Sequence, residues 1–118
     1  MKCRWYRGWR RSLDDPVPTL LRLRDAAGGP EVDVTCVTRA WEREILERAV
    51  RVRIPGGPEV PVVAVEDLIV LKLLAGGPGD LADVADLLSR SGPLPGLEAR
   101  AAARGVGDLL RRVRESLG

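Results

Sequence analysis

The sequence predicts an α+β fold, a small mixed or antiparallel sheet with C-terminal helices. Two hairpin patterns interleaved with one helical pattern fill residues 1–65, and helical patterns fill residues 66–118. The chain has 118 residues, of which 45% are hydrophobic and 31% are charged. These proportions fit a globular domain better than a disordered tail. We therefore expect a single domain over residues 1–118, strand-rich in its first part and helical in its second.

The strand-rich part contains segments in which apolar and polar residues alternate. The four predicted strands are Thr19–Arg24, Glu31–Val37, Val50–Ile54 and Val60–Val65. Gly-Pro turns at 26–30 and 55–58 separate the members of each pair, so we expect two hairpins. Residues 1–13 show no clean period. Cys36 shares a face with Val32 and Val34, which predicts a buried thiol.

The helices are predicted from apolar spacing and from their terminal residues. Trp41, Ile45 and Ala49 recur at helical spacing after Thr38, a good N-cap, and predict a helix over 39–49. The C-terminal part is expected to hold four more helices: Glu66–Ala75, Asp80–Ser89, 97–104 and 107–117. Acidic residues favour the start of the first of these, and Asp80 is expected to cap the second.

The composition excludes several kinds of chemistry. The chain contains no His, so it cannot by itself form a Ser-His or Cys-His pair or a His-ligated metal site. Seventeen of its nineteen cationic residues are Arg, and Asn and Gln are absent. This pattern fits either GC-rich coding or a thermophilic source. Cys3 and Cys36 form no CxxC motif, and no segment is typical of secretion or of membrane insertion, so we expect free thiols, a cytoplasmic location and no membrane partner.

Positive charge is concentrated near the N-terminus, where cations are interspersed with aromatic side chains. The residues concerned are Arg4, Trp5, Arg7, Arg10 and Arg11. Such a mixture suits stacking on single-stranded nucleic acid. A leftover strand with solvated arginines, or a partly disordered terminus, would have the same composition.

The most informative cluster surrounds Lys72, which stands alone in an otherwise apolar helical pattern. A lysine placed there needs a carboxylate partner or an aqueous cleft. Asp80 and Asp83 follow at i, i+3 spacing, and the Gly-rich corner between the helices would fold them back toward Lys72. Asp33 lies on the polar face of a predicted strand. Lys72 then either locks two helices together or contacts a polyphosphate while the carboxylates hold a divalent metal.

A resemblance to a known family rests on an ordered set of motifs. These are Val-Asp-Val at 32–34, Trp41 with Arg48-Ala49, Glu66-Asp67-Leu68-Ile69, Lys72-Leu73, Ala75-Gly76 and Asp80-Leu81-Ala82-Asp83. In this order they resemble the C-terminal part of AbiEii-like or minimal nucleotidyltransferases of toxin–antitoxin and phage-defence systems. The resemblance covers about residues 8–88. It implies that Asp33 corresponds to the third catalytic carboxylate, that Lys72 contacts the triphosphate, and that Asp80 and Asp83 support that lysine.

The family's metal-binding motif, a Gly-Ser helix start followed by Asp-x-Asp on a strand, has no match in the sequence. Asp14 and Asp15 are adjacent and would point to opposite faces of a strand. Gly77 and Gly79 stand where the family usually has cations. The resemblance therefore implies a truncated, non-catalytic nucleotidyltransferase-like domain that serves as a nucleotide-binding or interaction module.

Two alternatives remain at this level. A partner chain or a further N-terminal segment could complete an active nucleotidyltransferase, which would then use Mg²⁺ and a nucleoside triphosphate. A small RNA-binding protein could use the Arg/Trp-rich N-terminus. No metal site and no certain cofactor is predicted. A truncated domain would expose an apolar sheet face, so we expect a homodimer that buries this face, with a partner protein or nucleic acid as further candidates.

Overall fold

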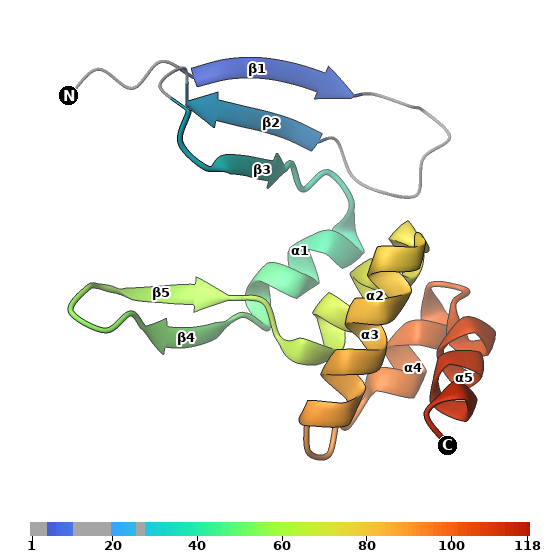
Figure 1. The fold of residues 1–118 in the computed structure, drawn as a ribbon. Coiled ribbons are helices and arrows are strands. Elements are labelled where there is room, and N and C mark those ends of the chain that lie inside the picture. Colours follow the sequence, from blue (N-terminus) through green and yellow to red (C-terminus); the bar gives the residue numbers. More distant parts are fainter. Residues whose placement is uncertain (1–4, 11–19, 26–27) are drawn as a thin grey trace. The chain divides into compact units, whose positions relative to one another are not determined.

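A computed structural model describes residues 5–10, 20–25 and 28–118 of the chain. It confirms the α+β class: two small antiparallel sheets, with one helix between them, precede four C-terminal helices (Figure 1). The chain forms two compact units, residues 1–43 and residues 44–118. No described helix has the length and apolar character needed to cross a membrane.

The first unit contains a three-stranded sheet in the order β1-β2-β3. Its strands are β1 (Trp5–Arg10), β2 (Leu20–Asp25) and β3 (Glu31–Thr35). The predicted hairpin of β2 with β3 is confirmed, and Arg22 lies opposite Asp33 in its register. Strand β1 was not predicted, because its mixture of Arg and aromatic residues shows no clear alternation. It pairs with β2 along its whole length, from Trp5 opposite Asp25 to Arg10 opposite Leu20.

Two expectations for the first unit are wrong. Cys36 is exposed, as are Val32 and Val34, because alternation shows which side chains share a face but not whether a second layer covers it. Helix α1 (Ala40–Glu47) begins after Arg39, and Thr38 does not cap it. Instead the buried carboxylate of Glu42 accepts hydrogen bonds from the N–H groups of Thr38 (2.7 Å) and Arg39 (3.0 Å).

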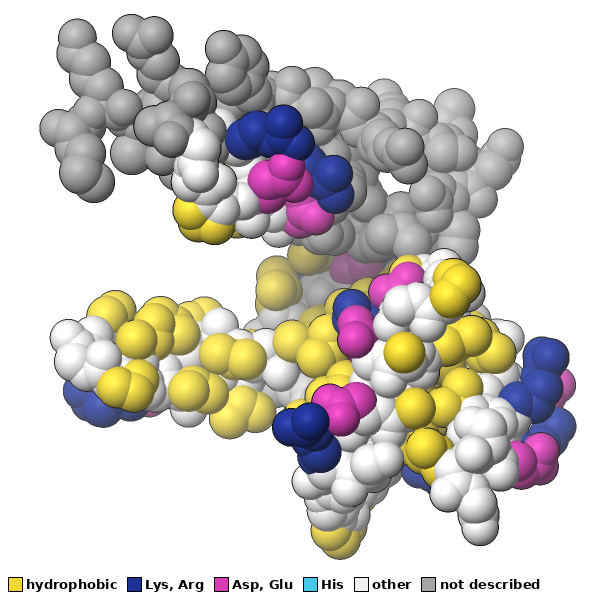
Figure 2. Space-filling model, viewed as in Figure 1, with side chains coloured by type: hydrophobic (Ala, Val, Ile, Leu, Met, Phe, Trp, Pro, Cys, Tyr) yellow, Lys and Arg dark blue, Asp and Glu magenta, His cyan; other side chains and the backbone are white. Residues whose placement is uncertain are grey.

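The second unit begins with the remainder of α1 and a two-stranded hairpin. Strands β4 (Val50–Arg53) and β5 (Glu59–Val62) pair antiparallel, as predicted. The hairpin extends away from the helices of this unit (Figure 1). Figure 2 shows hydrophobic side chains over much of its surface. Within the second unit, its extensive contacts are all between its own two strands.

Four helices form the rest of the second unit. They are α2 (Val65–Ala75), α3 (Pro78–Arg90), α4 (Leu97–Ala103) and α5 (Gly107–Ser116). Helix α2 packs against α3 and α4, and α5 packs against α3 and α4. The buried core contains Ile69, Val70, Leu73, Val84, Leu97, Ala101, Leu110 and Val113. Every one of the four helices contributes to it, so this core holds the helical part together.

Leu73→Ala should lower the free energy of unfolding by about 2–5 kcal/mol, because it leaves a cavity in this core. Equilibrium urea denaturation measures this change. Leu117→Ala is the matched control, since Leu117 is 47% exposed, and it should change stability by less than about 0.5 kcal/mol. Equal losses in the two variants would contradict the core described above.

Candidate functional site

Lys72, Asp80 and Asp83 lie together where α2 turns into α3. The Nζ atom of Lys72 is 2.7 Å from Oδ2 of Asp83 and 3.5 Å from Oδ1 of Asp80. All three side chains come from one corner of the second unit. The structure therefore brings this part of the predicted cluster together.

Glycine and aspartate at the corner between the helices make this arrangement possible. Helix α2 ends at Gly76, which has a φ of 67° and donates its N–H to the carbonyl of Lys72 (2.9 Å). A left-handed residue at this position favours glycine. Asp80 was expected to be the N-cap of the second helix. Instead α3 begins at Pro78, and Asp80 accepts a hydrogen bond from the N–H of Gly77 (3.2 Å) from the third helical position.

The corner is partly exposed and carries more negative than positive charge. The Lys72 side chain is 31% exposed and the Asp83 side chain 57% exposed. The hydrogen bond to Asp83 is the main cause that raises the pKa of Lys72 above its ordinary value. The ion pairs thus contribute stability below that ordinary pKa and lose it as the pH rises through the raised one. One lysine between two carboxylates has a net charge of −1, so a phosphate would bind here only together with a cation.

Asp33, the predicted catalytic carboxylate, belongs to the first unit. Its two oxygens accept hydrogen bonds from Arg22, from Nε at 2.8 Å and from Nη2 at 3.3 Å. Arg22 is also the main cause that lowers the pKa of Asp33. Next to this pair on the same sheet, Arg24 bonds Glu31. Asp33 is thus one half of an exposed cross-strand ion pair.

Five N-terminal residues were predicted to contact nucleic acid. Trp5, Arg7 and Arg10 lie on β1. Arg4 and Arg11 lie outside the described residues. Among the described residues, no group of three or more His, Cys, Asp or Glu side chains could hold a metal ion.

The sequence analysis did not predict a buried ionic group that is centred on Asp67. Its side chain is only 3% exposed. Arg48 approaches it with two hydrogen bonds, from Nε (2.9 Å) and Nη2 (2.8 Å), and Nη1 of Arg100 lies 3.7 Å from Oδ2. The hydrogen bond to Asp67 is the main cause that raises the pKa of Arg48. Asp67 thereby links the segment after α1, the first turn of α2 and the middle of α4.

A signal for this group is present in the sequence. Asp67 lies three residues before Val70 and so shares a side of the helix with a buried residue. A carboxylate on an apolar face needs a partner for the same reason that Lys72 does. The sequence analysis instead used Asp67 for the favourable electrostatics of a helix N-terminus and as part of the motif set behind the family resemblance. Arg48 and Asp67 are 19 positions apart in the sequence, so no local pattern indicates the pair.

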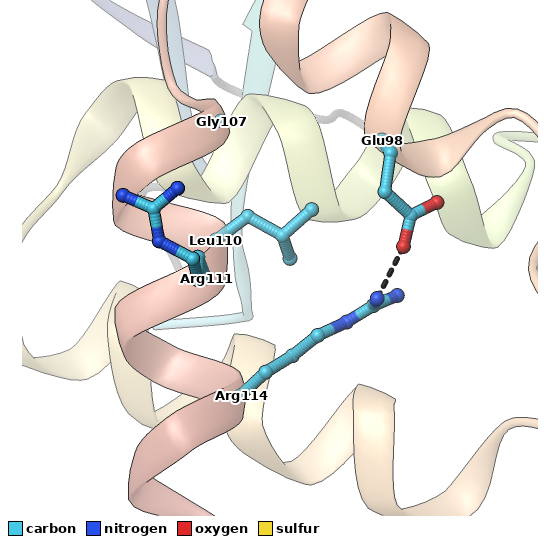
Figure 3. A pocket seen from close by; sticks show the side chains of 5 residues that line it. All are labelled: Glu98, Gly107, Leu110, Arg111 and Arg114. Carbon is cyan, nitrogen blue, oxygen red and sulfur yellow. Dashed lines mark ion pairs between the residues drawn. The ribbon is translucent and has the colours of Figure 1, made fainter.

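A pocket of about 250 Å³ lies between α4 and α5, and none of the predicted site residues lines it (Figure 3). Its lining consists of Glu98, Gly107, Leu110, Arg111 and Arg114. Glu98 bonds Arg114 across the pocket, and Arg111 donates to Asp108 (2.9 Å). The charged groups of this pocket are therefore engaged with one another or with their neighbours.

Asp67→Asn should lower the free energy of unfolding by about 2–4 kcal/mol. The substitution removes the negative charge that lies against both Arg48 and Arg100. The loss of stability is smaller than for a fully buried ion pair, because both arginine side chains reach solvent. Asp86→Asn is the control, because its ion pair with Arg90 is exposed and should contribute less than about 0.5 kcal/mol. Urea denaturation of both variants measures the difference. A neutral Asp67→Asn variant would show that the buried group does not stabilise the unit.

No protein-family model, no curated protein and no solved structure matches this chain. The resemblance to nucleotidyltransferases therefore stays a prediction, based on the motifs in the sequence. The function must therefore be inferred from the geometry of the described residues.

Proposed function

We propose that the chain is a non-catalytic interaction module of nucleotidyltransferase-like origin, which binds another protein chain through its β4–β5 hairpin. The observation that carries this proposal is an exposed aliphatic face. This face consists of Val50, Val52, Ile54, Val60 and Val62; four of these are 40–54% exposed, and Val60 is half-buried. A contiguous apolar surface of this kind is typical of a surface that another chain covers.

The carboxylates also support a non-catalytic function. Two-metal nucleotidyl transfer needs carboxylates that hold two ions about 4 Å apart. Asp33 is occupied at both oxygens by Arg22. Asp80 and Asp83 bond Lys72 at a helix corner. Each of these side chains therefore already has a structural partner.

Val52→Thr should change the free energy of unfolding of the monomeric chain by less than about 0.5 kcal/mol. Threonine keeps the shape and strand preference of valine, and its hydroxyl can reach water on an exposed face. Val84→Thr is the matched control, because Val84 is fully buried and an added hydroxyl there should cost about 1–3 kcal/mol. Denaturation at a protein concentration where sedimentation shows monomers measures both. If the two variants lose the same stability, the face belongs to the chain's own core and the proposal fails.

A second candidate function is weak binding of a magnesium nucleotide at the Lys72 corner. The observation that favours it is that a partly exposed ammonium lies against two carboxylates, one of them more than half exposed. Lys72 would contact the phosphates as a point charge, and Asp80 and Asp83 would contribute oxygen atoms to the metal. The net charge of −1 makes the metal necessary for this binding.

The two lysines of the chain, Lys2 and Lys72, make this second candidate easy to test. Mg-ATP should shift the side-chain NMR signal of Lys72, and Lys72→Met should abolish the binding heat in calorimetry while the fold is kept. Lys2→Met is the matched control and should leave the heat unchanged. Binding that survives Lys72→Met, or a Lys72→Met variant that unfolds, would favour a purely structural ion pair.

A further inference from the structure

We infer that the occupant of the aliphatic face is a second copy of this chain, packed face to face across a two-fold axis. This inference rests on the proposed function and names the partner for the same surface. The strand register places valines of the two strands side by side, because Val50 lies opposite Val62 and Val52 opposite Val60. Alternate residues of a strand point to the same side, so these four valines lie on one side of the hairpin. Ile54 follows β4 directly and continues the alternation of Val50 and Val52.

The charge distribution of the hairpin permits self-association. The opposite face of the hairpin contains Arg51 and Arg53 on β4, with Glu59 on β5. The aliphatic face contains no charged or polar side chain. Two copies can therefore meet across it without bringing like charges together, which would oppose association where a charged residue lies near the two-fold axis.

The edges of the hairpin argue against addition of a further strand. Pro61 lies on β5, and proline lacks the N–H that pairing with another strand needs, so it is accommodated with its nitrogen facing outward. Strand β4 carries two arginines, and charged side chains on an edge discourage strand addition. The remaining way to cover the hairpin is packing on its face.

Stacking of two such hairpins would give each aliphatic face the second sheet layer that a single copy does not provide. A two-stranded ribbon is marginal by itself, whereas two sheets packed about 10 Å apart bury both inner faces. Five half-exposed aliphatic side chains form a smaller patch than the ~800 Å² that each partner buries in a standard interface. We therefore expect a reversible dimer whose population depends on concentration.

Sedimentation equilibrium of the full chain between about 5 and 300 µM is the first test. The mean mass should rise from one chain toward two. Val52→Asp should raise the dissociation constant of the dimer at least about tenfold, because it places two carboxylates in an apolar interface. Arg51→Asp changes the neighbouring residue on the opposite face and should change that constant less than about threefold.

Chemical cross-linking gives a second measurement that does not depend on a disruptive variant. In a Cys3→Ser, Cys36→Ser background, Val52→Cys should be linked into dimers by a short bismaleimide. Arg51→Cys should not, because it lies on the outer face. Equal cross-linking of the two variants would overturn the inference.

A chain that stays monomeric over the whole concentration range, or equal effects of Val52→Asp and Arg51→Asp, would likewise overturn it. A different result would contradict the proposed function, namely a loss of monomer stability in Val52→Thr as large as that in Val84→Thr. A monomer in which Val52→Thr is neutral would exclude the second copy only, and the aliphatic face would then bind a different protein.

Discussion

The arrangement of the helical unit depends on one buried carboxylate, that of Asp67. Aliphatic side chains in a core attract one another without a preferred direction, so they favour compactness more than a single geometry. A guanidinium that bonds a carboxylate with two N–H groups has a defined orientation. Arg48 makes this contact with Asp67 from the segment after α1, and Arg100 approaches from α4. The start of α2 is thereby placed between two segments that are far apart in the sequence.

Ion pairs also form the Lys72 corner, where the side chains are more exposed to solvent than at Asp67. A left-handed Gly76 and the capping carboxylate of Asp80 reverse the chain, so that Asp83 comes within hydrogen-bond distance of Lys72. Exposed ion pairs contribute little to stability, and the aliphatic core between α2 and α3 contributes more. Ion pairs thus orient the helices of this unit, whereas the core supplies most of the stabilisation.

Periodicity predicted most of the fold, because hairpins and amphipathic helices are local patterns. It identified β2 with β3 and β4 with β5, and it predicted that the corner brings Asp80 and Asp83 to Lys72. It failed where the outcome depends on residues far away. Cys36 alternates like a core residue but is exposed, and Arg48 bonds Asp67, which lies 19 positions later in the sequence. Strand β1 is held by its pairing with β2 and not by its own pattern.

The hairpin also has a consequence for the lifetime of the chain in a cell. Arg51 and Arg53 lie on an exposed two-stranded ribbon, and such ribbons open locally at little cost. A protease that cuts after arginine would therefore reach these two sites in any unassembled copy. Once the inferred dimer forms, each ribbon is backed by another and opens less often. Turnover would then remove isolated chains and spare paired ones, so that degradation itself keeps the population assembled.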